Sequence, residues 1–419
     1  MNKNSNASTG LGCEPFLPED ARPVGISSFK RPSLLVMPPL ALYIHIPWCI
    51  RKCPYCDFNS HEAKSTIPEQ QYIDCLISDL EYSLPKIWGR RVYSIFFGGG
   101  TPSLFSAAGI DTVLAAVRAR VTLDSEAEIT LEANPGTFEA EKFRGFRDAG
   151  VNRLSIGIQS FNAQHLQALG RVHNDDEAKR AIDIAQRNFD NINLDIMFAL
   201  PRQTLAECAA DIETALAYNT NHLSIYHLTL EPNTLFHRFP PPLPDDDLSA
   251  DMHEMIEAKL AVAGYDHYET SAYAKVAKRS RHNMNYWQFG DYVGIGAGAH
   301  GKISYPDPAR GITREARFKQ PKSYMEQAPL GLSNQEEKMI SAAELPFEFM
   351  LNALRVSEGF SNNLFIERTG LPISVISREL QRAIELGLIE SDPLHVKPTA
   401  KGRLFLNDLL ELFLPSERP

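Results

Sequence analysis

Short apolar runs alternate with segments of helical periodicity over the first half of this chain. The first run contains Tyr43, Ile44 and Ile46, and further runs lie near residues 92–97, 129–133, 153–158, 193–197 and 222–228. Between the runs, apolar residues recur at helical spacing, as they do in residues 70–84. Strands separated by helices predict a parallel sheet with right-handed crossovers. Periodicity alone leaves a barrel and an open doubly wound sheet as alternatives.

The second half of the chain follows a different pattern. A proline-rich turn at 239–244 and three acidic residues at 245–247 precede a predicted helix over 248–263, and residues 265–273 alternate like one strand. Helical segments near 343–355, 361–368 and 373–386, a β wing over 388–398 and a last helix over 402–413 give a winged-helix-like α+β outline. We therefore expect a disordered extension (1–40), the alternating α/β unit (41–240), a flanking extension (241–335) and a C-terminal domain (336–419).

Composition and charge narrow the class of protein. The 419 residues are 43% hydrophobic and carry a net charge of −10, with an isoelectric point near 5.7. Nucleic-acid binding needs clustered Lys and Arg, and the third helix of the C-terminal domain offers only Arg378 and Arg382 amid Glu379 and Glu385. We expect no nucleic-acid partner, and we interpret this domain as a docking or lid domain.

The N-terminal segment and the cysteines indicate the cellular compartment of the protein. The first 36 residues have no apolar segment of the kind found in signal peptides, and we expect them to be disordered, with Met37 as an alternative translation start. No run approaches the roughly 20 apolar residues of a membrane span. Three of the six cysteines form a closely spaced group. Free thiols of this kind indicate a reducing compartment, so we expect a cytoplasmic protein.

The closely spaced group is Cys49, Cys53 and Cys56, in the pattern C-x-x-x-C-x-x-C directly after the first predicted strand. Three thiolates on one loop are suited to a 4Fe–4S cluster, in which one iron then lacks a protein ligand. A structural zinc site is the alternative, but it would need a fourth ligand, for which His61 is the local candidate. A disulfide framework fits less well, because Cys13, Cys75 and Cys208 lie far away in the sequence.

The cysteine loop resembles that of the radical S-adenosylmethionine (radical SAM) superfamily. This resemblance implies a partial (βα)6 barrel, with a 4Fe–4S cluster at Cys49, Cys53 and Cys56 whose open iron binds S-adenosylmethionine. Working groups of such folds lie at the carboxyl ends of strands. Residue by residue, the related binding pattern places the SAM site at Tyr43, Tyr55, Gly99, Gly100, Thr101, Glu132, Gln159, Arg171 and Asp195. Taken singly, each strand-end residue could equally be a capping or salt-bridging residue.

A second motif lies at His282-Asn283-x-x-Tyr286-Trp287. From the residues alone, a well-ordered loop is one interpretation and a haem site is another, since imidazole ligates iron and aromatic rings pack on a macrocycle. The stretch matches the HNxxYW motif of the HemW family of haem chaperones. Residues 43–49 and 53–61 also resemble the corresponding segments of this family. The resemblance therefore implies haem as a third ligand, held by His282, Asn283, Tyr286 and Trp287.

Two functions share this scaffold. The related HemN family, the oxygen-independent coproporphyrinogen III oxidases, has a further cysteine two residues after the triplet, where this chain has Phe58. The sequence therefore favours a haem chaperone over an oxidase that decarboxylates porphyrinogen propionates, and charge disfavours a DNA-binding regulator. The resemblance implies haem and haem-acceptor proteins as partners, contact with a membrane surface during delivery, and a homodimer as one assembly state.

Overall fold

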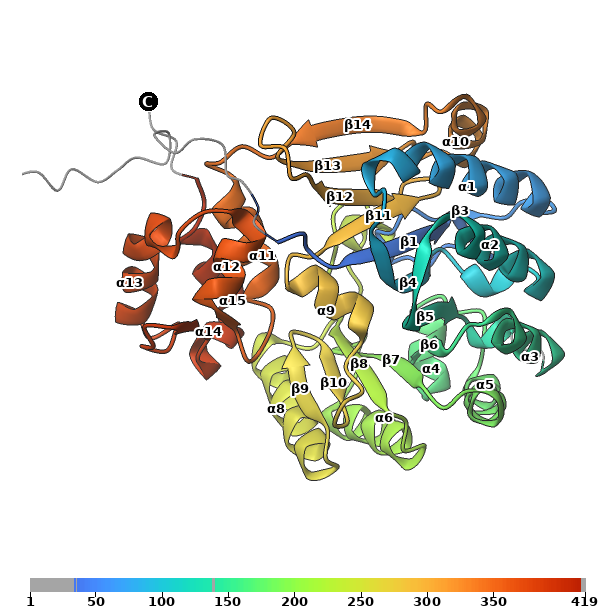
Figure 1. The fold of residues 1–419 in the computed structure, drawn as a ribbon. Helices are drawn as coiled ribbons and strands as arrows, with labels where there is room; N and C mark the ends of the chain where they lie inside the picture. Colours follow the sequence, from blue (N-terminus) through green and yellow to red (C-terminus); the bar gives the residue numbers. More distant parts are fainter. Residues whose placement is uncertain (1–33, 35, 138–139, 416–419) are drawn as a thin grey trace, which may run out of the picture.

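A computed structural model describes residues 34, 36–137 and 140–415. One twelve-stranded sheet runs through most of it, in the order β14-β13-β12-β11-β1-β4-β5-β6-β7-β8-β10-β9 (Figure 1). The six central strands pair in parallel and in chain order. They are β1 (Leu40–Ile46), β4 (Arg91–Gly99), β5 (Thr122–Ala133), β6 (Arg153–Gln159), β7 (Ile192–Phe198) and β8 (His222–His227). These are the six strands that the apolar runs predict.

Helices between the strands cover the outer face of the sheet. They are α1 (Glu69–Ser83), α2 (Ala107–Arg120), α3 (Ala140–Ala149), α4 (Ala163–Ala168), α5 (Asp175–Asn188) and α6 (Leu205–Ala217). Two of them begin with a capping box, Asn174 with Glu177 in α5 and Thr204 with Glu207 in α6, which satisfies the free N–H groups of the first turn. Short 3-10 turns, Leu84–Lys86, Pro102–Leu104 and Pro135–Thr137, complete the connections.

Side chains alternate between the two faces of each central strand. Ile44, Ile95, Leu131, Leu154 and Leu194 point outward into the core shared with the helices. Their neighbours point inward, and many of these inward side chains are polar and line one cavity. The strand alternation thus separates a dry outer core from a polar interior.

The segment expected to flank the barrel instead extends both edges of the sheet. At one edge, β9 (Asp266–Glu269) and β10 (Ala272–Ala274) form a hairpin beside β8, so the single strand expected over 265–273 is wrong. The chain turns at Thr270 and Ser271, which the alternating pattern does not reveal. At the other edge β11 (Asp291–Ile295) joins β1 in parallel, followed by the antiparallel strands β12 (His300–Ser304), β13 (Ile312–Arg317) and β14 (Asn334–Met339).

Further helices accompany these strands. They are α7 (Leu235–Arg238), α8 (Asp246–Val262), α9 (Arg281–Trp287), α10 (Pro321–Gln327) and the 3-10 turn Ala328–Leu330. The HNxxYW motif therefore lies on a helix, α9, and not in a loop. Ser280 caps α9 by accepting from the Asn283 N–H group. Two short strands, β2 (Trp48–Cys49) and β3 (His61–Glu62), pair at the cysteine loop.

The C-terminal region has its own hydrophobic cluster (red in Figure 1). It contains α11 (Leu345–Ala353), α12 (Asn362–Thr369), the 3-10 turn Ile373–Ile376, α13 (Ser377–Glu385), α14 (Ala400–Leu404) and α15 (Leu406–Glu411). The expected wing is small: β15 (Phe360–Ser361) pairs with β16 (His395–Val396), and Ile389 bridges Pro398. Phe289, just after α9, packs on Phe349 at 5.7 Å, which joins this region to the sheet.

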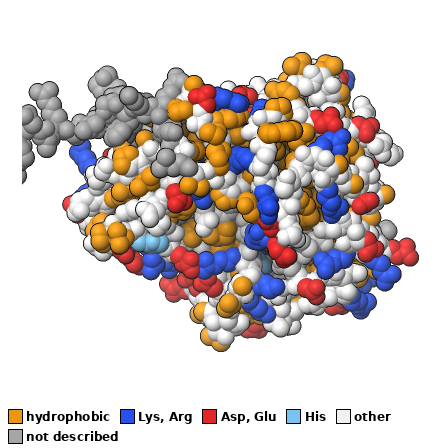
Figure 2. All heavy atoms as spheres, viewed as in Figure 1, with side chains coloured by type: hydrophobic (Ala, Val, Ile, Leu, Met, Phe, Trp, Pro, Cys, Tyr) orange, Lys and Arg blue, Asp and Glu red, His pale blue; other side chains and the backbone are white. Residues whose placement is uncertain are grey.

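The surface carries mixed charge on the face drawn in Figure 2, where basic and acidic side chains are interspersed. Among the described residues, no helix is both long and apolar enough to cross a membrane. The disorder expected for the first 36 residues concerns a segment that, apart from Leu34 and Val36, lies outside the described residues.

Candidate functional site

The three cysteines lie on the loop that follows β1 and line one cavity at the carboxyl ends of the parallel strands. All three are free thiols of intermediate exposure. Arg171 donates to the Cys53 sulfur at 3.7 Å, and Ser60 Oγ lies 3.9 Å from the Cys56 sulfur. The loop therefore presents the three sulfurs to a common space.

The donor set fits a cluster better than a single ion. In the described part of the chain, no three His, Cys or acidic side chains are arranged to hold one metal ion, which gives the zinc alternative with His61 no geometric support. In a 4Fe–4S cluster each thiolate binds a different iron, so the sulfurs need not meet at one point. Burial raises the pKa of Cys49 and of Cys56, so these thiols would release protons on binding iron. Cys75 and Cys208 are buried free thiols elsewhere, and Cys13 lies outside the described residues.

Asn59 holds the cysteine loop from its far end. Its amide donates to the Ala297 carbonyl at 2.9 Å and to the Lys319 carbonyl at 2.8 Å. Its own carbonyl lies 2.9 Å from His45 Nε2, and burial lowers the pKa of His45 to about 4, so the imidazole stays neutral. The loop is thus tied to the turn between β11 and β12, two hundred residues later in the chain.

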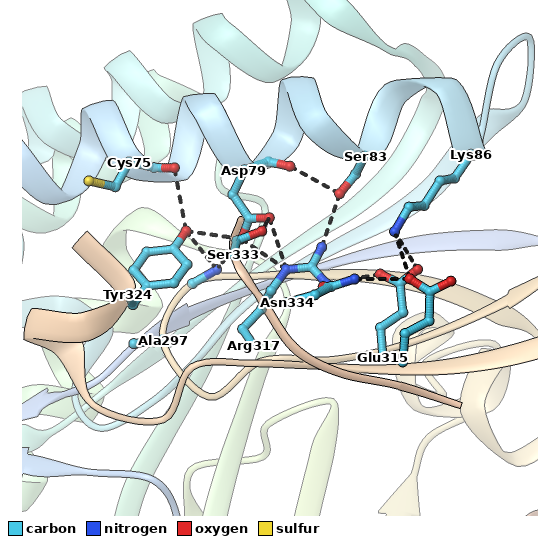
Figure 3. A network of polar contacts seen from close by, with 12 residues as sticks. Cys75, Asp79, Ser83, Lys86, Ala297, Glu315, Arg317, Tyr324, Ser333 and Asn334 are labelled. Atoms are coloured by element: carbon cyan, nitrogen blue, oxygen red, sulfur yellow. Dashed lines mark hydrogen bonds and ion pairs between the residues drawn. The ribbon is translucent and has the colours of Figure 1, made fainter. Parts of the chain in front are cut away.

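That turn rests on a buried network of polar side chains, which we call the α1–β13 network (Figure 3). Its members are Asp79, Ser83, Lys86, Glu315, Arg317, Tyr324, Ser333 and Asn334. Asp79 accepts from the Gly296 N–H group at 3.2 Å, and Tyr72 accepts from the Ala297 N–H group at 2.8 Å. These hydrogen bonds hold the backbone at Gly296 and Ala297 in place. The Ala297 carbonyl is therefore positioned to accept the hydrogen bond from the Asn59 amide.

In the glycine turn at the end of β4, the glycines are required by close packing against neighbouring protein groups, whereas the sequence indicates contact with a ligand. A Cβ on Gly99, whose φ is +117°, would lie 2.6 Å from the His45 ring, and one on Gly100 would lie 2.5 Å from the Trp48 carbonyl oxygen. Both glycines thus allow close packing against β1 and the cysteine loop. The turn still faces the cavity, because Gly99, Gly100 and Thr101 all line it.

Glu132 and Asp195 are inward residues of β5 and β7, which lie on either side of β6. Glu132 accepts from the Gly99 N–H group at 3.2 Å, and burial, with a smaller contribution from Asp195, raises its pKa to about 8. Burial also raises the pKa of Asp195, whose carboxylate accepts from Ser155 at 3.1 Å and from Asn193 at 2.7 Å. A cationic ligand would offset the cost of ionising these two acids, because opposite charge favours the ionised form.

Gln159 and Arg171 come together at the end of β6. Gln159 has a φ of 70°, which is uncommon for a residue other than glycine and is often found at functional sites. Arg171 donates to the Gly157 carbonyl at 2.7 Å. The Arg171 side chain also lies beside the Tyr55 hydroxyl, and burial raises the pKa of Tyr55, so its phenol stays neutral. Tyr55, which lies between Cys53 and Cys56, packs on Phe236 at 6.4 Å.

The cavity brings most of the predicted residues together. Its volume is about 680 Å³, within the range of small-molecule sites. The predicted residues that line it are Cys49, Cys53, Tyr55, Cys56, Gly99, Gly100, Thr101, Glu132, Gln159, Arg171, Asp195 and Asn283. Tyr43 lies behind this wall, where its hydroxyl is 3.0 Å from His45 Nδ1 and its ring stacks on Phe96.

The other three residues of the HNxxYW motif do not line the cavity. His282 is 1% exposed, its Nδ1 is 3.0 Å from Ser94 Oγ, and its ring stacks on Phe96 at 4.9 Å. Burial, together with the charge of Arg153, lowers the pKa of His282 to about 3. Its Nε2 has no hydrogen-bond partner among the described residues, and neither does the Trp287 indole nitrogen. Binding of His282 to iron would therefore require this packing to open.

The sequence interpretation missed several polar residues deeper in the cavity. They are Arg153, Ser155, Asn193, Ser224 and Arg355. Four of them are inward-facing positions of strands, where a polar residue interrupts an otherwise apolar run at period two. That interruption was the available signal, because an inward polar side chain in a buried strand needs a partner or a ligand.

The chain matches two family models in this order. Residues 43–215 match the radical SAM superfamily, and residues 340–405 match the HemN C-terminal domain. A solved structure of coproporphyrinogen III oxidase (HemN) from Escherichia coli superposes with a TM-score of 0.77 over 91% of each chain, at 22% identity. That likeness establishes the fold, an α/β radical SAM fold with a large mixed sheet and a C-terminal region, as the sequence predicted.

Curated relatives are similar over nearly their whole length. Heme chaperone HemW of Haemophilus influenzae is 48% identical over 91% of this chain and 99% of its own. Heme chaperone HemW of Escherichia coli is 48% identical over 91% of this chain and 100% of its own. A mitochondrial radical S-adenosyl methionine domain-containing protein 1 of Mus musculus is 36% identical over 90% of this chain and 87% of its own. The chain therefore belongs to the HemW family of the radical SAM superfamily.

Proposed function

We propose that this protein is a haem chaperone, which binds haem and delivers it to acceptor proteins. The observation that carries the proposal is the 48% identity to heme chaperone HemW of two organisms across nearly the full length of each relative. Similarity over the full length includes the C-terminal region as well as the cofactor cavity. The whole arrangement, and not one domain, supports the assignment.

The cofactors that we propose for the cavity are a 4Fe–4S cluster and S-adenosylmethionine. Cys49, Cys53 and Cys56 would hold the cluster, and its open iron would bind the amino and carboxylate groups of the cofactor. Glu132 and Asp195 would accept hydrogen bonds from the N–H donors of the amino group and from the ribose hydroxyls, because both face the same cavity as the thiols. The cluster supplies one-electron chemistry when it is bound. This chain's own residues bind, orient and shield the ligand.

The oxidase alternative shares the fold but differs at the rim of the cluster loop. Phe58 is 61% exposed and lines the cavity. The HemN oxidases have a cysteine at this position. An aromatic ring here replaces a polar sulfur with an apolar surface. This surface is suited to contact with a flat apolar ligand such as a macrocycle.

The test is to incubate anaerobically reconstituted protein separately with haem and with coproporphyrinogen III, S-adenosylmethionine and a reductant. We expect a Soret band from bound haem and no decarboxylated product. Turnover of coproporphyrinogen III would refute the chaperone assignment in favour of the oxidase. The variant Phe58→Cys is tested in the same assay. Turnover of coproporphyrinogen III by this variant, and not by the wild type, would mean that position 58 alone separates the two activities.

Cluster binding has a separate test. Cys53→Ala should lose its iron and sulfide, because one of three protein ligands is removed. Cys208→Ala is the matched control, since Cys208 is a buried free thiol outside the cavity. Equal iron and sulfide in Cys53→Ala and the wild type would refute the cluster site.

His282 as an axial ligand of haem is also a proposal. If α9 opens to expose the imidazole, His282→Ala should shift or abolish the Soret band of the haem complex. If His282 only packs α9 against Ser94 and Phe96, the variant should bind haem with an unchanged spectrum and unfold at a lower temperature. The two outcomes differ in the spectrum, which a purely structural role does not change.

A further inference from the structure

Arg153 is a buried arginine without adequate partners. It is the first residue of β6, its side chain is 3% exposed, and it lines the cavity. Among the described residues it forms one ion pair, with Glu128 at 4.0 Å, and its Nε has no hydrogen-bond partner there. A guanidinium group has five N–H donors in a planar fork, so this single long ion pair leaves Arg153 poorly satisfied.

The acids around Arg153 are Glu128, Glu132 and Asp195, and each of them also accepts hydrogen bonds from other groups. Glu128 also accepts from the His282 N–H group at 3.2 Å and from Ser280 at 3.4 Å, so its lone pairs are shared. Glu132 has a pKa of about 8 and is mostly protonated at neutral pH. Burying a cation without full compensation is costly. The cost falls when a ligand anion enters the cavity and accepts the free N–H groups.

A second arginine, Arg355, reaches the same cavity from the C-terminal region. It follows α11 and lines the cavity, and its guanidinium carbon lies 4.7 Å from the centre of the Trp287 ring. Its Nε is buried and also has no partner among the described residues. Trp287 is the last residue of the HNxxYW motif, so the motif helix α9 helps to place this arginine.

Asn283, on the same helix, is the motif residue that lines the cavity directly. No described residue forms a hydrogen bond with its side-chain amide, which leaves both its N–H donors and its oxygen available. Arg153, Asn283 and Arg355 thus come from a strand, the motif helix and the C-terminal region, and all three line one cavity. Two planar guanidinium groups and an amide are suited to carboxylate oxygens, which accept two parallel hydrogen bonds from an arginine.

We infer that Arg153, Arg355 and Asn283 form a carboxylate-binding subsite in the cavity, apart from the cysteine loop. The subsite would take a carboxylate of a bound ligand. In the haem chaperone that we propose, this is a propionate of haem, so the identity of the ligand rests on the proposed function. S-adenosylmethionine also carries a carboxylate, which the proposed function assigns to the open iron, and the experiment separates the two sources.

The test measures dissociation constants of anaerobically reconstituted full-length protein for two pairs of ligands. The first pair is haem and haem dimethyl ester, which lacks free carboxylates. The second pair is S-adenosylmethionine and its decarboxylated analogue. Arg153→Gln should weaken binding of the carboxylate-bearing member of one pair about 10-fold or more, and leave the other member of that pair unchanged.

Matched variants keep the result interpretable. Arg144→Gln makes the same charge change at an exposed position of α3 outside the cavity and should bind all four ligands as the wild type does. Arg153→Lys keeps the charge but not the fork and should weaken binding less than Arg153→Gln. Should Arg153→Gln fail to fold, Arg355→Gln, at a half-buried position, tests the same subsite.

The outcomes distinguish the inference from the function on which it rests. A loss confined to haem, and absent for its ester, supports the subsite with haem as the source. A loss confined to S-adenosylmethionine supports it with that cofactor as the source. Equal affinities of wild type, Arg153→Gln and Arg355→Gln in both pairs overturn the subsite, even where haem binds. Wild-type protein that binds no haem refutes the proposed function, while the second pair still tests the subsite.

Discussion

Two buried arginines in this protein have opposite surroundings. Arg317, at the end of β13, is 1% exposed and donates to Asp79 at 2.9 Å, to Glu315 at 2.9 Å and to Ser83 at 3.0 Å, and it also donates to Asn334 (Figure 3). Arg153 is 2% exposed, but its one ion pair is at 4.0 Å and its side chain opens into a cavity. A fully satisfied buried charge is typical of a structural network, whereas an unsatisfied one next to a cavity indicates a ligand site.

The acids in the two regions differ in the same way. Burial raises the pKa of Glu315, but Arg317 and Lys86 outweigh burial and hold it below its usual value. Burial raises the pKa of Glu132 to about 8, and the backbone N–H group of Gly99 offsets only part of the shift. The α1–β13 network therefore favours the ionised form of Glu315, while burial at the cavity favours the protonated form of Glu132.

The largest effect is expected from breaking the α1–β13 network. Arg317→Gln leaves Asp79 and Glu315 buried without their main cation, so the free energy of unfolding should fall by about 3 to 5 kcal/mol. Chemical denaturation of the variant and wild type measures this difference. Arg144→Gln is the surface control and should change the free energy by less than about 0.5 kcal/mol. A change equally small in Arg317→Gln would contradict the structural role of the network.

The raised pKa of Glu132 should make the free energy of unfolding depend on pH. Its folded-state pKa of about 8 lies above the usual 4.5, so its contribution is fully present below pH 4.5 and is lost as pH rises through about 8. Through this group, the free energy of unfolding should fall by about 3 kcal/mol between pH 5 and pH 8. Denaturation across this range should show a flatter profile for Glu132→Gln.

Glu315 should affect the free energy of unfolding in the opposite sense, with a contribution that is lost in acid. Its pKa is lowered in the folded state, so its contribution is present above the usual 4.5 and is lost as pH falls through the folded value. Glu315→Gln should therefore change stability at neutral pH and little in strong acid. Coinciding pH profiles of the two variants would mean that the two regions do not differ as described.

Double variants compare the regions at equal charge change. Asp79→Asn with Arg317→Gln should lose roughly 2 to 3 kcal/mol, because the donors Ser333, Tyr324 and Gly296 lose acceptor capacity. Glu128→Gln with Arg153→Gln should lose less than about 1 kcal/mol, because few good hydrogen bonds are removed with the pair. Equilibrium denaturation of both variants gives the comparison. A larger loss from the cavity pair would reverse the assignment of roles.

Within the network, the smallest effect is expected from one hydroxyl. Tyr324→Phe removes the hydrogen bond to Asp79 at 3.0 Å and the acceptor for the Gly296 N–H group at 3.1 Å. Asp79 still accepts from Gly296, so the loss should be about 1 kcal/mol in the free energy of unfolding. Tyr82→Phe, at a more exposed position of α1, is the control and should leave stability unchanged within error.

The sequence determined much of the central sheet and most of the cofactor wall. Apolar runs at strand length located β1 and β4 to β8, because buried parallel strands have a strong local signature. The cysteine group could be identified from its spacing, whereas strand-end residues such as Glu132 and Asp195 were indicated only by the resemblance of their short motifs to the radical SAM superfamily. The hairpin of β9 and β10 was mistaken for one strand, since its two-residue turn has no glycine or proline to mark it.

Only the tertiary structure decided the surroundings of the buried charges. Nothing local distinguishes Arg153 from Arg317, because the difference depends on partners that lie far away in sequence: Asp79 is 238 residues from Arg317. The same holds for the HNxxYW motif, whose sequence suggests a haem ligand but whose His282 is packed against Ser94 and Phe96 of β4. A sequence specifies which groups are available, whereas burial and the distance to other charges, which set their pKa and their need for a ligand, arise only when remote segments pack together.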